Sequence, residues 1–413
     1  MNKNSLLSGI RVLDLTRVLA GTVAGQTLAD LGAHVIKVER PKSGDDSRSW
    51  VPPYLNPDAR PELRESAYFA SVNRGKHSIA VNLATQEGQE IIRRLAKESD
   101  VLLENYKPGT LARYGLDDAT LRALNPRLVY CSLTGFGQTG PCRDRTGYDS
   151  VMQAMGAMMD LTGEAQGAPQ KVGLSIIDIM TGLYAVIGIL AALEERARSG
   201  LGQYIDLALF DTQIAALSTV AVGFLADGVL PRRLGNAHPS VVPSGAFACR
   251  DGDLQLLAGN QGQFVKLCAA LGIPDLAGDT RFIDMGARAR NREILNAILS
   301  DILKTRPRAA WVQLLNEAGV PCGPINTVAE ALEEPQVAAR QMLRAMAHPT
   351  VGELRFIANP LKFSRTPIEY EIAPPLLGQH TRYILETLGY GQDDIQTLLA
   401  QGIVQDSHIE SQL

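Results

Sequence analysis

The sequence predicts an α/β protein whose first part is built around a parallel sheet. Between residues 9 and 133, short apolar segments that suit strands alternate with longer segments of helical period. This alternation is typical of βαβ units, in which a helix connects two parallel strands. The turn after the first strand reads DLTRVLAGTVAG and lacks the GxGxxG fingerprint, so we expect no NAD or FAD there. Together these observations predict a Rossmann-like sheet with another ligand.

Each element of this part follows from a local pattern. The predicted strands are apolar runs bounded by polar residues or glycine, as in buried parallel strands, and cover residues 9–15, 33–39, 78–83, 100–104 and 128–133. The predicted helices place apolar residues at helical spacing and cover residues 23–31, 86–97 and 120–125. Gly32 ends the first of these helices, because glycine is common just after a helix.

The remaining chain predicts a second domain. A long apolar helix from Ile176 is followed by a strand over 200–209 and a helix to Leu225. An irregular stretch over 226–240, rich in Gly, Pro and Arg, is typical of a linker. Further on, two short strands are predicted at residues 245–249 and 254–258, and helices rich in Leu, Ala and Arg follow them. A proline-marked extended region then leads to a final helix.

Composition excludes several classes of function. The 413 residues are 45% hydrophobic and 20% charged, with a net charge of −4, so we expect no nucleic-acid or membrane partner. Five single cysteines without a CxxC pair argue against disulfides and zinc, and histidines in HxxxH or HExxH spacing are missing, so we expect no metal site. GxSxG and GxxxxGK[ST] are missing as well. The N-terminal residues lack the apolar run of a signal peptide, which predicts a cytoplasmic protein.

One carboxylate, Asp178, lies inside an apolar run of about twenty residues that ends near Leu193. An ionised carboxylate in such surroundings is costly unless donors meet it or it takes part in a reaction. Asp178 could cap the start of the helix, or it could face a ligand beyond the helix start; the residues alone leave both open. The run has the length of a membrane span, but Asp178 near its end and no basic flank favour a buried helix of a soluble protein.

Basic and polar residues follow several of the predicted strands. They share a place at the carboxyl ends of strands, where ligands of open α/β sheets bind: Arg17, Arg40, residues 73–76, residues 105–109 and Arg113. A single arginine there would more often be a solvated surface residue. The recurrence of basic residues at the ends of several strands predicts a ligand that carries phosphate.

Nine segments with distinctive motifs extend over nearly the whole chain: residues 13–21 (LDLTRVLAG), 29–41 (ADLGAHVIKVERP), 44–48 (GDDSR), 71–78 (SVNRGKHS), 104–109 (ENYKPG), 132–141 (SLTGFGQTGP), 147–149 (GYD), 320–325 (VPCGPI) and 374–380 (PPLLGQH). Together these segments resemble the class III CoA-transferase family, which has the formyl-CoA transferase-like fold. Thr22 departs from the proline of many relatives.

The resemblance implies that Asp178 matches the catalytic nucleophile, which forms an aspartyl mixed anhydride and then an aspartyl-CoA thioester. It implies no permanently bound cofactor, with CoA and acyl-CoA as substrates. By motif position, the residues matching the CoA contacts are Leu19, Ala20, Arg40, Val81, Asn82, Leu83, Ala84, Asn105, Tyr106, Arg113, Thr146, Gly147, Tyr148 and Asp149. Candidates for holding the acceptor acid are Arg17 and His238.

The resemblance also implies an interlocked homodimer. Each chain would have a Rossmann-like large domain built from both termini and a smaller central α+β domain. The corresponding boundaries are 1–225 (large domain, first part), 226–240 (linker), 241–335 (small domain), 336–370 (linker) and 371–413 (large domain, last part).

Within the family, the motifs resemble most the branch acting on succinyl-CoA and C4–C6 dicarboxylates such as glutarate. Leu19 replaces the glutamine of the oxalate/formate enzymes, and no glycine-run loop occurs near 235–262, so formyl-CoA:oxalate exchange is a weaker alternative. A CoA-thioester racemase or isomerase is another, but that branch has histidine where this chain has Tyr148. A non-catalytic acyl-CoA carrier would leave the apolar setting of Asp178 unexplained.

Overall fold

The computed structural model describes residues 5–60 and 64–407, which divide into two compact units. Unit 1 comprises Met1–Gly156, Val172–Ala221 and Ala338–Leu413, and unit 2 comprises Ala157–Lys171 and Val222–Val337. The sequence did not predict that residues 157–171 group with unit 2. They do so because the Arg233 guanidinium donates to the carbonyl oxygens of Asp160 (2.7 Å), Glu164 (3.1 Å) and Gly167 (3.0 Å).

Unit 1 contains a seven-stranded sheet in the order β12-β3-β2-β1-β4-β5-β6. Its strands are β1 (Arg11–Asp14), β2 (His34–Glu39), β3 (Lys76–Val81), β4 (Val101–Glu104), β5 (Val129–Thr134), β6 (Tyr204–Ala208) and β12 (Val404–Gln405). All neighbours are parallel except β12, which pairs antiparallel with β3. The prediction of a parallel sheet is confirmed, whereas β12 was not predicted. Because the order reverses between β1 and β4, the carboxyl ends of these two strands form the ligand-binding edge expected for such sheets.

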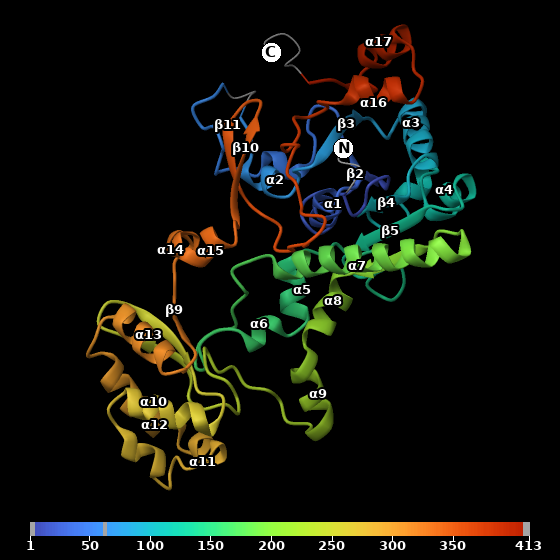
Figure 1. Cartoon of the computed structure of the whole chain (residues 1–413). Coiled ribbons are helices and arrows are strands. Elements are labelled where there is room, and N and C mark those ends of the chain that lie inside the picture. The colour runs from blue at the N-terminus through green and yellow to red at the C-terminus, as the bar shows by residue number, and fades with distance from the viewer. Residues whose placement is uncertain (1–4, 61–63, 408–413) are drawn as a thin grey trace. The chain divides into compact units, whose positions relative to one another are not determined.

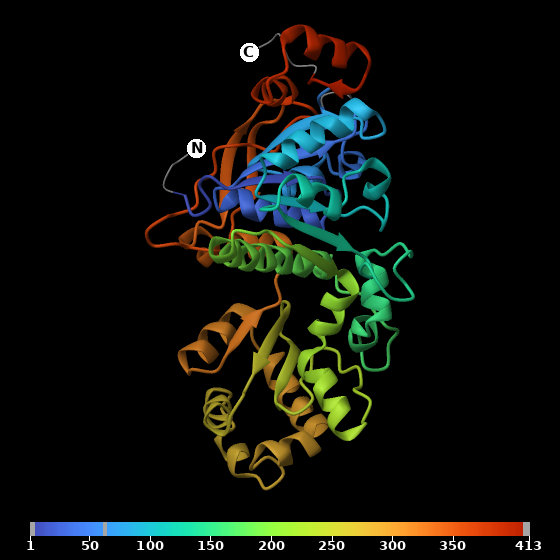
Figure 2. The same ribbon diagram turned by 90° about the vertical axis from the view of Figure 1, so that its right-hand side faces the viewer.

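Helices cover both faces of this sheet, and Figure 2 shows it between α7 in green and α3 in light blue. The helices and 3-10 turns of unit 1 before the second unit are α1 (Ala20–Asp30), η1 (Asp46–Ser49), α2 (Ala67–Ser71), α3 (Gln86–Lys97), η3 (Leu111–Tyr114), α4 (Asp118–Leu124), α5 (Asp149–Met155), α7 (Ile176–Ser199) and α8 (Leu209–Ala216). Residues 86–97 form a helix with the predicted bounds, since the Thr85 side chain accepts from the backbone N–H of Gly88. The first helix begins three residues earlier than predicted.

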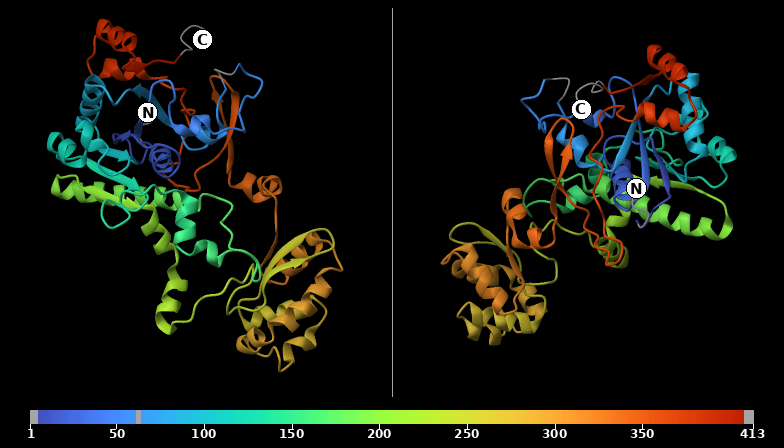
Figure 3. Two further views of the ribbon diagram at one scale, coloured as in Figure 1. Left: turned by 180° about the vertical axis from the view of Figure 1, so that it is seen from behind. Right: turned by 45° about the horizontal axis from the view of Figure 1, so that its top comes forward.

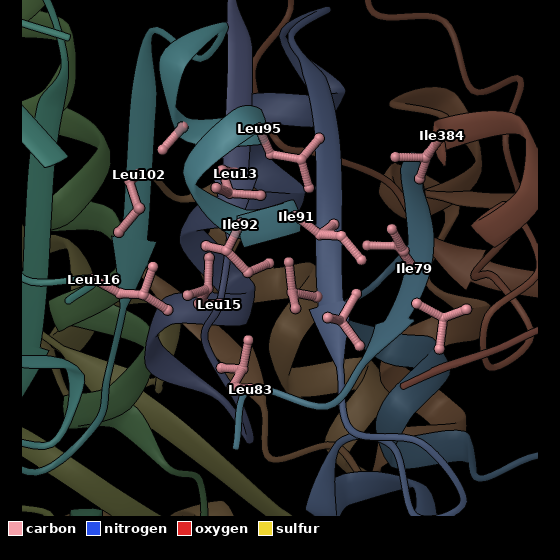
Figure 4. Packing of buried hydrophobic residues seen from close by; sticks show 14 of the residues in the cluster. Leu13, Leu15, Ile79, Leu83, Ile91, Ile92, Leu95, Leu102, Leu116 and Ile384 are labelled. Atoms are coloured by element: carbon pink, nitrogen blue, oxygen red, sulfur yellow. The ribbon is translucent and has the colours of Figure 1, made fainter. Parts of the chain in front are cut away.

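One face of the sheet packs against α3, as Figure 4 shows for Leu13, Ile79, Ile91 and Ile92. The C-terminal part of the chain returns to this face through α16 (Thr381–Thr387) and α17 (Gln392–Ala400). These red helices lie near α3 in both views of Figure 3. Their buried side chains belong to the same apolar cluster as those of the strands, so removing α16 and α17 would expose part of the core.

The opposite face packs against α1 and α7. By length and composition α7 could cross a membrane, and so could α8 together with α9 (Ser218–Asp227), which are bent by 66°. Ala185 and Ile189 of α7 are fully buried among strand residues, whereas Leu183 and Ile187 are exposed. The prediction of a buried helix is therefore confirmed for one face of α7.

Unit 2 has its own core beneath the three-stranded sheet β7-β8-β9. Figure 1 labels its α-helices and β9. Its elements are α6 (Met158–Leu161), β7 (Ser244–Ala248), β8 (Asp253–Leu257), α10 (Gln261–Ala270), η4 (Pro274–Gly278), α11 (Met285–Arg290), α12 (Arg292–Leu303), α13 (Arg308–Glu317), β9 (Cys322–Pro324) and α14 (Val328–Glu333). Helix α15 (Pro335–Ala339) leads back to unit 1, where β10 (Leu343–His348) and β11 (Gly352–Ile357) form a hairpin. The two predicted strands of this region correspond to β7 and β8.

Candidate active site

A cavity of about 230 Å³ lies at the carboxyl ends of β1, β4 and β5, at the edge where the strand order reverses. Its wall comes from the loops that follow these strands and from the start of α7. The lining residues are Arg17, Val18, Leu19, Ala20, Asp46, Asn105, Tyr106, Lys107, Pro108, Leu133, Thr134, Gly135, Arg143, Arg145, Thr146, Gly147, Tyr148, Asp178 and Leu209. Sequence segments far apart thus meet at one site.

Asp178 lies in the first turn of α7 and lines the cavity. The helix begins at Ile176 after Ser175, so the interpretation of Asp178 as the cap residue is wrong. Within the described residues no group donates a hydrogen bond to its carboxylate. Burial, and then the nearby negative charge of Asp149, raise the pKa of Asp178 to about 7. A carboxylate of this kind is a stronger base than a solvated one and is poised to react.

Asp149 takes the capping role at α7 instead. Its carboxylate accepts hydrogen bonds from the backbone N–H of Ile177 (2.8 Å) and of Asp178 (3.3 Å). The Gln153 side-chain amide donates to the other carboxylate oxygen of Asp149, at 2.5 Å. Asp149 thereby satisfies free N–H groups of the helix start, and Asp178 keeps its side chain available to the cavity.

Close contact between α1 and α7 brings the two sides of the cavity together. A Cβ atom on Gly182 would lie 2.5 Å from the carbonyl oxygen of Ala20, so only glycine permits this approach. Because Gly182 is one turn beyond Asp178, the start of α1 lies near the start of α7. This contact explains why Leu19 and Ala20 line the same cavity as Asp178.

The segment after β1 is tied to the segment after β4. The Asn105 side chain accepts from the Arg17 backbone N–H (3.0 Å) and donates to the Arg17 carbonyl oxygen (2.8 Å). The Arg17 guanidinium lies 4.8 Å from the centre of the Tyr106 ring and 3.4 Å from the Asp46 carboxylate. Its Nε atom is buried and has no hydrogen-bond partner in residues 5–60 and 64–407. A buried donor of this kind calls for an acceptor from a ligand.

Nine of the residues predicted for the site line the cavity, Asp149 caps the helix that carries Asp178, and the others lie outside the cavity lining. Arg40 is paired with Asp46 at the cavity edge (2.6 Å). The segment 81–84 runs from the last residue of β3 into the turn before α3, and Arg113 is exposed in η3. His238 lies in unit 2, where its Nδ1 accepts from the backbone N–H of Ser240 (3.2 Å) and Val241 (3.0 Å). These bonds give His238 a structural role in its own loop.

Sequence reasoning missed several residues of the site. Arg143 and Arg145 line the cavity but were not among the predicted residues. Their loop follows a predicted strand, so it could have been included with the other cationic loops. Tyr68 of α2 was also missed; burial, followed by the nearby charge of Asp178, raises the Tyr68 pKa. No local pattern marks Tyr68, because only the fold brings α2 near the start of α7.

Comparison with known proteins gives consistent relatives. Residues 7–381 match the model of CoA-transferase family III. A succinate–glutarate CoA-transferase of Agrobacterium fabrum is 45% identical over 94% of this chain and 96% of its own length. The mouse succinyl-CoA:glutarate CoA-transferase is 43% identical over 97% of this chain and 90% of its own length. A CAIB/BAIF family protein from Brucella suis, solved as a crystal structure, has a TM-score of 0.84 and 46% identity, and the match covers 93% of this chain and 100% of that chain.

The family match covers most of the chain, and it includes every strand of the parallel part of the sheet and all residues that line the cavity. The similarity to the two curated CoA-transferases extends over almost the full length of both proteins. The chain is therefore a CoA-transferase enzyme and belongs to CoA-transferase family III.

Proposed function

We propose that this enzyme transfers CoA from succinyl-CoA to a C4–C6 dicarboxylate such as glutarate, with Asp178 as the nucleophile. The observation that carries the proposal is the Asp178 carboxylate, whose pKa is raised to about 7, in a cavity that three arginines also line. The carboxylate is suited to attack a thioester carbonyl, and the arginines are suited to bind anionic substrates.

In the first half of the reaction, an oxygen of the Asp178 carboxylate attacks the thioester carbonyl of succinyl-CoA. The carbon–sulfur bond breaks, leaving a mixed anhydride of Asp178 with succinate and the CoA thiolate. The thiolate then attacks the side-chain carbonyl carbon of Asp178. Succinate leaves as a carboxylate, and Asp178 holds CoA as a thioester.

In the second half, a carboxylate of glutarate attacks the same carbon of Asp178 and expels the thiolate. The thiolate attacks the glutaryl carbonyl of the new anhydride, which forms glutaryl-CoA and returns the Asp178 carboxylate. Each step exchanges one activated acyl bond for another, so no ATP is consumed. The intermediates hydrolyse in water, and a partly buried nucleophile reduces this loss.

The choice of a dicarboxylate has two supports. Relatives of this chain are named for glutarate, oxalate, D-citramalate and mesaconate, all of which carry two carboxylates. In addition, the unpaired Nε of Arg17 provides a buried donor for the carboxylate that does not react. For the CoA moiety we propose the predicted contacts after β1, β4 and β5, with Arg40 and Arg113 as partners of its phosphates.

Acceptor discrimination tests this function. With succinyl-CoA as donor, we expect glutarate to be used about 100-fold more efficiently than valerate, which has the same chain length and one carboxylate. A site built to pair two carboxylates rejects an acid that leaves a buried cation unpaired. Oxalate belongs in the same panel, because one relative is named for it. Equal kcat/KM for glutarate and valerate would remove the dicarboxylate assignment.

The reaction should also depend on pH. Because Asp178 must be ionised to attack, kcat/KM for succinyl-CoA should rise with pH and level off above the pKa of Asp178, about 7. Asp149→Asn removes the charge that helps to raise this pKa. In this variant the rise of kcat/KM with pH, the rising limb of the pH profile, should therefore lie at lower pH. Asp149→Glu keeps the charge and serves as the matched control. A limb at the same pH in Asp149→Asn would show that Asp149 does not act on Asp178 through its charge.

We also propose the Rossmann-like description of the large domain, the interlocked homodimer and the cytoplasmic location. The strand order β3-β2-β1-β4-β5-β6 supports the first. Exposed apolar side chains on α9, among them Val222 and Leu225, support a surface that a second subunit covers.

A further inference from the structure

A cluster of buried charges lies next to the cavity and takes no part in the reaction described above. Lys37 pairs with Asp45 and Lys76 pairs with Asp14, each at 2.8 Å, and all four side chains are 0% exposed. Although burial opposes ionisation, Lys37 holds the pKa of Asp45 well below its usual range. Burying an ion pair is costly and often no better for stability than an apolar pair, so a role beyond stability is expected.

The pair of Lys37 and Asp45 holds the backbone after β1. The Lys37 ammonium donates to the carbonyl oxygen of Thr16 (2.9 Å). The Asp45 carboxylate accepts from the backbone N–H of Val18 (3.1 Å). It also accepts from the backbone N–H (2.9 Å) and hydroxyl (2.8 Å) of Ser47, which fix the carboxylate in place. One ion pair thus forms hydrogen bonds with the backbone at both ends of the segment from Thr16 to Val18.

These hydrogen bonds stabilise a strained backbone conformation at Val18. Its φ angle is 69°, in the left-handed region that a β-branched residue rarely adopts. The next residues, Leu19 and Ala20, begin α1 and line the cavity together with Val18 and Asp178. If Val18 relaxed to an ordinary conformation, the direction of the chain would change immediately before these residues.

We propose that Lys37 and Asp45 are positioning residues of the acyl-CoA site, which hold Val18 in its left-handed conformation and so place Leu19 and Ala20 against Asp178. The inference rests on the proposed function only in assigning the cavity to acyl-CoA. Its physical basis is a fully buried ion pair in which Lys37 donates to the Thr16 carbonyl oxygen and Asp45 accepts from the Val18 backbone N–H. Because Leu19 and Ala20 line the cavity together with Asp178, the pair is expected to act chiefly on the reacting end of the substrate.

A third ion pair, between Asp30 and Arg74, provides a matched control. Asp30 and Arg74 are joined at 2.6 Å with side chains 3% and 8% exposed, so they are almost as buried. Asp30 lies at the other end of α1, and its further partner is the Asn359 side chain (3.1 Å). Asp30→Asn should therefore lower thermal stability without changing kcat in the folded enzyme.

The test is a double-mutant cycle between Asp45 and Val18. Glycine adopts a φ of 69° without strain. In the Val18→Gly variant, the hydrogen bond to Asp45 is therefore no longer needed to keep this conformation. We expect Asp45→Asn to lower kcat at least about tenfold in the unmodified chain, with little change in KM for succinyl-CoA, and less than about threefold in the Val18→Gly background. Should Asp45→Asn not fold, Asp45→Asn with Lys37→Met removes both charges and replaces it in the cycle.

The outcomes separate the inference from the proposed function. Equal losses of kcat in both backgrounds would overturn the inference, as would a loss confined to KM, while leaving CoA transfer to glutarate intact. Absence of succinyl-CoA:glutarate transfer in the unmodified enzyme would instead count against the proposed function. In that case the same cycle is read with the donor and acceptor that the enzyme does use.

Discussion

Asp178→Asn is expected to lower the turnover of CoA transfer on the order of a thousandfold or more, because the amide cannot form the anhydride or the thioester. The enzyme incubated with succinyl-CoA should yield a hydroxamate at residue 178 after hydroxylamine, or a reduced side chain after borohydride, located by peptide mapping. Glu194→Gln removes an exposed carboxylate from the same helix and should leave turnover unchanged. Modification at another residue, or near-normal turnover in Asp178→Asn, would rule out the nucleophile.

The same variant should be more stable than the unmodified enzyme at neutral and higher pH. Folding raises the pKa of Asp178 from 3.8 to about 7, so the native state disfavours the ionised form. The gain from asparagine should be absent below about pH 4, grow as pH rises toward 7 and stay constant above it. We expect on the order of 1–3 kcal/mol at pH 8, measured by urea unfolding. A stability loss there would indicate that the carboxylate has a structural partner.

Arg17→Met is expected to lower the preference for glutarate over valerate by about 10- to 100-fold, chiefly by slowing transfer to glutarate. The reason is that Arg17 lines the cavity and its buried Nε has no acceptor within the described residues. The measurement is kcat/KM for both acids with succinyl-CoA as donor. Tyr106 keeps its contact with the aliphatic part of methionine, so the change removes mainly the charge.

Arg143→Gln provides the comparison, since Arg143 lines the same cavity but its side chain is 46% exposed. We expect this variant to keep its preference for glutarate. If Arg143→Gln loses the preference and Arg17→Met keeps it, the second carboxylate binds at Arg143 and the assignment of Arg17 is wrong.

The sequence by itself determined the elements and their order. The helix of residues 86–97 and the strands around Leu13, Val35 and Leu102 are set by apolar periodicity and by local caps, which depend on neighbours along the chain. Where a boundary depended on something else, the prediction failed. The helix predicted to run to Leu225 is broken at Ser218, where φ is 41°, and α1 begins early because Val18 turns the chain just before it.

Only the tertiary structure decided what surrounds Asp178. Its place in an apolar run was visible in the sequence, but the sequence left open whether it caps the helix, and Asp149 from another element takes that role. Arg143, Arg145 and Tyr68 were missed, and Lys37 read as an ordinary strand residue although it supports the cavity wall. The physical reason is that local periodicity reports burial within one element, whereas convergence of side chains depends on strand order and on the approach of α1 to α7.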